Sequence, residues 1–415
     1  MDRPLTRSQL LRWRAAVFAI FAASGLSIAT WASRVPAIKS TLGIGNAEIG
    51  VLLLLAGIAS VVGLSLSSFL LARFGARRSM LGAMIAYAIG VATIGVGTDA
   101  LHAYPVVLVG LVLFGVGNGS VDVMMNVEGA AIEKQFGRTL LPLFHAFFSF
   151  GTVLGAGFGA LAVAWGLNVL AHTAIAGAVI LVTAFVAIAN VPSREVAMDP
   201  SAPAAPWRDR LVTALSAWRE PRTYALGVVM LGMAFAEGSA NDWLALGVVD
   251  GHDGSEALGA AALAVFSVAM TVTRVVGGPL VDRFGRVMTL RVLAAFAAAG
   301  LLLFVFAPNL PLVFAGALLW GVGASMGFPL GMSAAADDPA RAAARVAAAS
   351  TIGYVAFLVG PPVLGVVSEH IGLLNTLLII VVLVIASGIA SPAARPLPGA
   401  HVGEGRATTG DDARG

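Results

Sequence analysis

Residues 111–133 read LVLFGVGNGSVDVMMNVEGAAIE, and this is the most informative stretch of the chain. It is apolar enough to form a helix inside a membrane, yet it contains Asn118, Asp122 and Asn126. Their four-residue spacing places all three along one face of a helix. An acid within a spanning helix is costly and usually faces the protein interior or a water-filled cavity. We therefore predict that Asp122 is the chemical centre of the protein.

The composition indicates a membrane protein. Of the 415 residues, 58% are hydrophobic and 11% are charged, whereas a soluble domain has about a quarter charged residues. Apolar runs long enough to cross a hydrocarbon core of about 30 Å recur along the chain. No ten-residue alternation typical of a membrane β-barrel is present, so the fold class is all-α and polytopic. We predict twelve transmembrane helices, near residues 14–33, 47–71, 79–98, 104–126, 142–165, 168–190, 222–244, 257–281, 288–307, 311–334, 346–368 and 372–390.

Several kinds of chemistry are excluded or unsupported. The chain has no cysteine, which rules out disulfides, thiol chemistry and cysteine-ligated metal. It has no Walker loop to bind ATP and no His/Glu metal constellation, so we expect neither a cofactor nor a metal. Nothing assembles a nucleophile, a base and a metal, so we do not expect an enzyme. The net charge is +3, and the basic residues that produce it lie in short loops between the spans. This distribution argues against a nucleic-acid partner.

The basic residues also predict the orientation of the chain in the membrane. If the N-terminus is cytoplasmic, 22 of the 25 Lys and Arg residues lie on the cytoplasmic side. Arg34 and Lys39 fall on the outer side, and Arg274 falls within a span. The outer loop near Asp250 and Asp253 has no positive charge. We predict a multi-pass protein of the bacterial cytoplasmic (inner) membrane with both termini in the cytoplasm.

An internal repeat divides the chain into two halves. The loop ARFGARR at 72–78 returns as DRFGRVM at 282–288, an offset of 210 residues. Such a repeat indicates an alternating-access transporter with its site between the halves. We predict six-helix bundles at 1–190 and 222–390, joined by a cytoplasmic linker, 191–221, and followed by a disordered tail, 391–415. In the linker, an apolar stripe predicts a short interfacial helix, formed by Trp207, Leu211, Leu215 and Trp218.

The second copy of the repeat, GPLVDRFGR at 278–286, resembles the signature loop G-x-x-x-D-R-x-G-R of the major facilitator superfamily. The first copy differs in having Ala72 where the family has an acid. The resemblance implies a gate at the cytoplasmic side, whereas an ordinary basic turn is the alternative. The residues assigned to this gate are Arg73, Arg77, Asp282, Arg283 and Arg286.

A closer resemblance is to the fucose–proton symporter branch of that superfamily. The matching features are Asp122 with Asn126, the stretch Phe148-Ser149-Phe150-Gly151, Arg274, and Phe328-Pro329. The chain departs from the branch near Ala32, where the branch has an acid. Glu237-Gly238 and Asp242-Trp243 resemble a subgroup of largely uncharacterised bacterial members. The resemblance implies proton-coupled transport of a sugar-like solute.

Each candidate site residue also has a structural interpretation. We assign proton coupling to Asp122, Glu237 and Arg274, although Asp122 could be a structural acid capped by Asn118, Asn126 or backbone. Arg274 could pair with Glu237 or with Asp242 simply to neutralise charge. His145 could shuttle protons or bond to backbone, and Trp31 and Trp243 could flank a cavity or sit in an interfacial belt. The predicted substrate-binding set is Asn118, Asn126, His145, Asn241, Asp242, Trp243 and Trp31.

Small residues predict how the helices pack. Gly151, Gly155 and Gly159 recur every four residues in the fifth span. This spacing leaves one face of the helix without side chains, and such faces allow close approach of a second helix. We therefore predict a tight helix contact along this face.

We predict a secondary active transporter of a small polar, sugar-like solute, coupled to protons, working as a monomer in the lipid bilayer. One alternative is a proton-driven drug or metabolite exporter, which a cavity lined by Met124, Met125, Met233 and Met326 would favour. A second alternative is a non-transporting membrane sensor. It would need a sizeable signalling domain, for which the 25-residue tail 391–415 is a poor candidate.

Overall fold

The computed structural model describes residues 6–136, 140–192, 216–338 and 341–397. These residues form helices and short connections, and no β-strand occurs among them. The first half comprises α1 (Arg7–Ala32), α2 (Val35–Leu42), α3 (Asn46–Gly95), the π-helical turn η1 (Val96–Ala100), α4 (Tyr104–Phe136), α5 (Leu141–Ala164) and α6 (Val169–Ala189). The second half comprises α8 (Pro221–Ser239), the π-helical turn η2 (Ala240–Leu244), α9 (Ala245–His252), α10 (Glu256–Phe306), α11 (Leu310–Ala324), α12 (Gly327–Ala335), α13 (Ala342–Ile371), α14 (Leu373–Ala390) and the 3-10 turn η3 (Ser391–Ala394).

Two glycines divide the longest helices at equivalent points of the repeat. Gly75 in α3 has φ 74° and ψ 167°, and Gly285 in α10 has φ 75° and ψ 161°. This backbone region is essentially restricted to glycine.

Within the described residues, eleven segments are long and apolar enough to span a membrane, one of them being 256–306. Because Gly285 splits that segment into two crossings, the described residues form twelve spans, as predicted.

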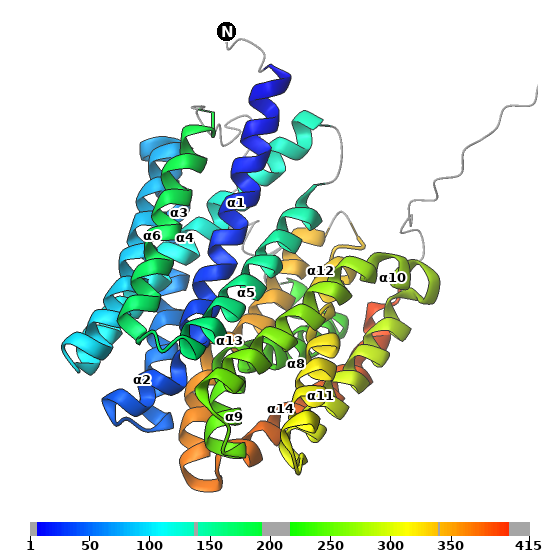
Figure 1. Cartoon of the computed structure of the whole chain (residues 1–415). Helices are drawn as coiled ribbons and strands as arrows, with labels where there is room; N and C mark the ends of the chain where they lie inside the picture. The colour runs from blue at the N-terminus through cyan, green and yellow to red at the C-terminus, as the bar shows by residue number, and fades with distance from the viewer. Residues whose placement is uncertain (1–5, 137–139, 193–215, 339–340, 398–415) are drawn as a thin grey trace, which may run out of the picture.

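The two halves lie side by side and contact each other mainly along two helix pairs (Figure 1). Within the first half, α3 packs on α4 and α1 packs on α5, and within the second half α10 packs on α11 and α8 packs on α13. Between the halves, α5 packs on α10 and α3 packs on α13. A group on α5 or α10 can therefore reach the opposite half.

The contact between α1 and α5 depends on small residues. A Cβ added at Gly151 would lie 2.0 Å from the Ala22 carbonyl oxygen, and one at Gly155 would lie 2.5 Å from that of Leu26. Both distances are impossible for a real side chain without backbone movement. The predicted close packing of the fifth span is therefore confirmed, and its partner is α1.

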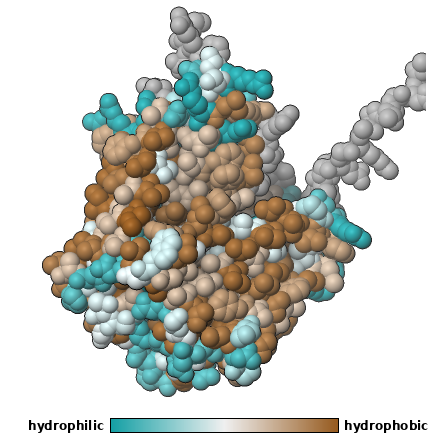
Figure 2. All heavy atoms as spheres, in the orientation of Figure 1, coloured by the Kyte–Doolittle hydropathy of each residue, from teal (hydrophilic) through white to brown (hydrophobic). Residues whose placement is uncertain are grey.

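The outer surface of the helices is apolar, as a bilayer requires. Figure 2 shows a hydrophobic band across the visible face of the molecule, with hydrophilic residues gathered toward its two ends. Side chains such as Ile389 and Val182 are 74% and 63% exposed. In water such exposure would be unfavourable, whereas lipid tails solvate these groups well. The described residues thus form the membrane-embedded body of the protein.

The structure refines the predicted boundaries in two places. The predicted tenth span, 311–334, is broken between Ala324 and Gly327, so that it consists of α11 and α12. The predicted tail begins with the ordered turn η3, in which Ser391 and Ala394 are fully buried. Residues 398–415 of that tail, and the linker stretch that contains Trp207, Leu211 and Leu215, lie outside the described residues.

Candidate functional site

The fourth span is one continuous helix, α4, and the residues predicted on its polar face have separate partners. Asn118 accepts a hydrogen bond of 2.7 Å from the Ser24 hydroxyl of α1. The Asn126 amide donates to the backbone carbonyl of Asp122 at 2.8 Å. Neither asparagine caps the Asp122 carboxyl group, which is half-buried and has no hydrogen-bond partner within the described residues. The capping interpretation of Asp122 is therefore not what the structure contains.

A residue from the opposite half lies near Asp122. Tyr354, on α13, is close enough to Asp122 for the charge of the carboxylate to act on its hydroxyl group. Because α13 belongs to the second half and α4 to the first, Asp122 faces the interface between the halves. An unpaired carboxylate in such a place is costly to bury unless it gains a proton or a hydrogen-bonding ligand.

His145 extends the polar face of α4 onto α5. Its Nε2 atom lies 3.1 Å from the Asn126 side-chain oxygen. This is a side-chain contact, and not the backbone bond that was the structural alternative for His145. His145 is exposed, so its side chain is not sealed in the core of the first half while it contacts Asn126.

Arg274, the basic residue within the eighth span, is the centre of the polar contacts in the second half. One terminal nitrogen contacts both carboxylate oxygens of Glu237, each at 2.8 Å. Of the two predicted partners, Glu237 and Asp242, the structure selects Glu237. Both side chains keep partial exposure, 21% for Arg274 and 17% for Glu237. The pair is therefore reachable by a ligand and not sealed in the core.

The same guanidinium also stabilises the break in the tenth span. Arg274 Nε donates to the Ser325 carbonyl at 2.8 Å, between α11 and α12. A helix end leaves its last carbonyl groups without partners in the helix, and lipid cannot supply donors. Arg274 thus supplies a donor at the interruption, which ties the geometry of α11 and α12 to the ion pair.

The third contact of Arg274 crosses to the first half. Its other terminal nitrogen donates to the Ser149 hydroxyl at 3.1 Å, and Ser149 in turn donates to the His145 carbonyl at 3.3 Å. A continuous series of contacts therefore runs from α4 through α5 to α10 and α8. We call this series the cross-half polar chain, and its members are Asn126, His145, Ser149, Arg274 and Glu237.

The predicted residues of the seventh span lie in the π-helical turn η2. Asn241 and Asp242 are half-buried, and the described residues provide no hydrogen-bond partner for either side chain. Trp243 and Trp31 are buried, with exposures of 0% and 4%, and neither indole nitrogen has a partner. Both rings are thus inside the protein and not in an interfacial belt. Single π-helical turns within helices are frequent at functional sites.

The predicted gating residues are at the end of the molecule that contains Gly75 and Gly285, here called the basic end. Arg73 lies over the ring of Phe74, and Arg283 repeats this contact with Phe284. Arg77 donates to the Ile188 carbonyl. Asp282 is exposed and has no ion-pair partner within the described residues.

Two acids that sequence reasoning missed form four of the ion pairs among the described residues at the basic end. Asp337 has a side chain that is only 3% exposed, and it pairs with Arg222 at 2.9 Å and Arg286 at 2.6 Å. Glu220 pairs with Arg341 and Arg345. These acids stand next to spans in the sequence, where they resemble ordinary loop residues.

At the opposite end, polar contacts join the two halves. Lys39 of α2 forms an ion pair with Asp250 of α9. The Ala47 amide donates to Glu369 of α13 at 3.1 Å. A Cβ added at Gly50 would lie 3.0 Å from the Pro361 carbonyl oxygen, so α3 and α13 touch there. These contacts hold the halves together at the end opposite the basic one.

The methionines that would favour a hydrophobic cavity are mostly core residues. Met124, Met125 and Met233 have exposures of 0%, 1% and 1%. Met233 packs against Gly327, and Met326 packs against Gly277. Three of the four side chains therefore fill the interior of a half instead of lining a surface that a solute could reach.

Comparisons with known proteins agree with this arrangement. The sequence model of the Major Facilitator Superfamily matches residues 16–361 and 243–410. An uncharacterised transporter of Sinorhizobium fredii is 32% identical over 369 residues, which cover 88% of this chain and 93% of the relative. An uncharacterised MFS-type transporter of Yersinia pestis is 32% identical over 355 residues, covering 84% and 87%.

Solved structures share the fold at low sequence identity. A variant of the nucleoside transporter NupG aligns with a TM-score of 0.75 and 15% identity, over 93% of this chain and 99% of that protein. The fucose–proton symporter FucP of E. coli aligns with a TM-score of 0.62 and 17% identity, over 94% and 100%. At these identities the likeness concerns the fold alone.

Proposed function

Since this chain belongs to the major facilitator superfamily of membrane transporters, we propose that it moves a small polar solute together with protons by alternating access. Sugars and nucleosides are the first solute classes to test, because structures of similar fold are a fucose–proton symporter and a nucleoside transporter. Transport by this mechanism needs a site between the halves that is reached from one side at a time.

The observation that carries the proposal is the cross-half polar chain. It offers a charged pair, an imidazole and an amide to a solute with several hydroxyl groups, next to the carboxyl of Asp122. Hydroxyl-rich solutes suit this region because the Asp122 carboxyl beside the chain has no hydrogen-bond partner within the described residues, and an unpaired polar group costs free energy until a partner arrives. The burial of Met124, Met125 and Met233 gives less support to a drug exporter, which stays the alternative function. The sensor alternative has less support still, because the relatives of this chain are described as transporters.

The proposed proton coupling rests on Asp122, which has no hydrogen-bond partner for its carboxyl group within the described residues. A charged Asp122 opposes occlusion of the interface between the halves, whereas protonation or a bound hydroxyl group relieves that cost. Only an interaction that differs between two states can couple a proton to a conformational change. Glu237 and Arg274 join this machinery because Ser149 links them to the first half, and relative movement of the halves must break that link.

The basic end and the opposite end act as the two gates in this proposal. Lys39–Asp250 and Ala47–Glu369 hold the opposite end closed. The loops that carry Arg73, Arg77, Asp282, Arg283 and Arg286 would close the basic end in the alternate state. Exchange between these closures would expose the cross-half polar chain to each side in turn.

The test of function is accumulation by the wild-type protein in liposomes. We expect one solute from a panel of L-fucose, related monosaccharides and nucleosides to accumulate when the outside is made acidic. A difference of one pH unit corresponds to about 1.4 kcal/mol, so coupling to one proton allows up to about tenfold accumulation. Gradient-driven expulsion of a hydrophobic cation such as ethidium, without accumulation of any panel member, would favour the exporter instead.

A second prediction concerns orientation, since we propose that the basic end faces the cytoplasm of a bacterium and that both termini lie there. Arg78 at the basic end and Thr41 at the opposite end are both exposed, and the native chain has no cysteine. In intact cells a membrane-impermeant maleimide should label Thr41→Cys and should label Arg78→Cys only after the cells are opened. The reverse labelling pattern would invert the proposed topology.

A further inference from the structure

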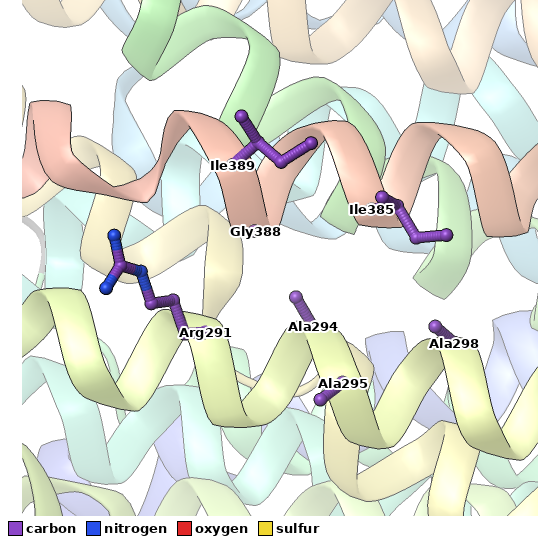
Figure 3. A pocket seen from close by; sticks show the side chains of 7 residues that line it. All are labelled: Arg291, Ala294, Ala295, Ala298, Ile385, Gly388 and Ile389. Atoms are coloured by element: carbon purple, nitrogen blue, oxygen red, sulfur yellow. The ribbon is translucent and has the colours of Figure 1, made fainter.

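A groove on the membrane-facing side of the second half has no role in the transport cycle described above. It lies between the part of α10 that follows Gly285 and α14, and its volume is about 450 Å³ (Figure 3). One wall consists of Arg291, Ala294, Ala295 and Ala298 from α10, and the other of Ile385, Gly388 and Ile389 from α14.

The groove exists because its lining side chains are small. Gly388 brings α14 close to α10, since an added Cβ there would lie 3.2 Å from the Ala294 side chain. Ala295 is exposed and Ala298 is half-buried, so neither fills the space beside this contact. Ile385 and Ile389 are 49% and 74% exposed. The groove is therefore apolar along its length and open to the surrounding lipid.

Arg291 is at one end of the groove. Figure 3 shows its side chain extending from α10 into the space between the two helices. Its Nε donates to the Ser391 hydroxyl at 3.3 Å, while its terminal nitrogens have no partner within the described residues. In contrast, Arg222 and Arg286 pair with Asp337, and Arg345 pairs with Glu220. Within the described residues, the terminal nitrogens of Arg291 are thus available to a ligand.

The position of Arg291 along α10 indicates what that ligand is. Arg291 follows Arg286, a residue of the basic end, by five residues, so it lies about 7.5 Å further along the helix toward the middle of the membrane. A charge at this depth on a lipid-facing surface is costly unless it reaches the interface or meets a counter-ion. The phosphate of a phospholipid is the anion available at that level, and basic pockets between transmembrane helices bind anionic head groups.

We propose that this groove binds one anionic phospholipid, with the phosphate on Arg291 and an acyl chain along Ala295 and Ala298 against Ile385. The terminal nitrogens of Arg291 can donate two hydrogen bonds to phosphate oxygens, and guanidinium suits this geometry. The apolar walls match an acyl chain and would leave a free phosphate ion with only one contact. The site is separate from the proposed solute site, because none of its lining residues belongs to the cross-half polar chain.

The experiment is native mass spectrometry of the full-length protein, with phosphatidylglycerol, phosphatidylcholine or inorganic phosphate added to the detergent solution. We expect one phosphatidylglycerol per protein, retained in preference to phosphatidylcholine, and no competition from inorganic phosphate at equal concentration. Arg291→Gln should weaken phosphatidylglycerol binding about fivefold, the usual effect of one basic residue near an anionic surface. Arg291→Lys should retain most of the binding, because it keeps the charge.

Two further variants separate the groove from general charge effects. Ala295→Phe should fill the groove and weaken lipid binding while Arg291 stays in place. Arg78→Gln removes an exposed charge at the same end but away from the groove, and should leave binding unchanged. Equal binding of the two lipids, or binding that Arg291→Gln and Ala295→Phe both leave intact, would overturn the proposal. A dimer that Ala295→Phe dissociates would assign the groove to a second copy of the chain instead.

Discussion

Asp122→Asn is expected to leave solute exchange intact and to abolish proton-driven accumulation. Asparagine resembles a protonated aspartate in size and cannot release a proton, so the substitution fixes the neutral state. The neutral side chain can still accept and donate hydrogen bonds to a solute. Occlusion of the interface between the halves no longer depends on proton uptake, and the link between the pH gradient and the movement of the halves is lost.

The measurement is uptake into liposomes with and without an imposed pH gradient. Where the wild-type protein accumulates its solute up to about tenfold at a gradient of one pH unit, Asp122→Asn should reach equal concentrations inside and outside. Asp253→Asn is the matched control, because Asp253 is exposed in an end loop with φ 52°, a conformation that asparagine tolerates. Full accumulation by Asp122→Asn would rule out Asp122 as the proton carrier.

The second large effect is expected at the ion pair of Glu237 and Arg274. Glu237→Gln leaves the Arg274 guanidinium within the membrane interior without its counter-charge. Removing one partner of a fully buried pair costs about 3–5 kcal/mol, and the remaining exposure of 21% and 17% reduces the expected loss to about 2 kcal/mol. We expect a lower thermal unfolding midpoint in detergent and loss of transport.

A double variant distinguishes a structural pair from a functional one. Glu237→Gln with Arg274→Met removes both charges, so most of the lost stability should return, although the Ser325 carbonyl then loses its donor. If the pair takes part in transport, activity stays absent although the protein is stable again. Recovery of transport together with stability would reduce Glu237 and Arg274 to a neutralising bridge. Ser149→Ala complements this test, because it removes the cross-half hydrogen bond and leaves both charges in place.

Much of the site could be predicted from residue type and spacing alone. Asp122, Asn126, Glu237 and Arg274 stand out because polar groups are rare and costly within spans. Their contacts could not be predicted in the same way. Glu237 and Asp242 lie within two turns of one helix, so both were possible partners of Arg274. Only the tertiary arrangement, which brings Glu237 of α8 within 2.8 Å of Arg274 of α10 and places Asp242 in a π-helical turn, decides between them.

Ser149 lies in a stretch that resembles the fucose–proton symporter branch, but nothing in the sequence predicted which residue Ser149 or Ser325 would contact. Serine is common in membrane helices, and Ser149 meets Arg274 across 125 positions of the chain. Ser325 matters through its backbone carbonyl, which every residue has. Asp337 is similar, since only the fold brings Arg222 and Arg286 to it from two other helices.

The sequence by itself determined the all-helical class, the twelve spans and the two related halves. Each span satisfies its own backbone hydrogen bonds, so its existence in lipid depends on local composition. The turn at Gly75 and Gly285 is local too, because few residues other than glycine adopt it. Only the tertiary structure decided the cross-half polar chain, the break at Ser325 and the groove at Arg291. Those features depend on how helices distant in sequence approach one another, through small residues and polar contacts that no single segment specifies.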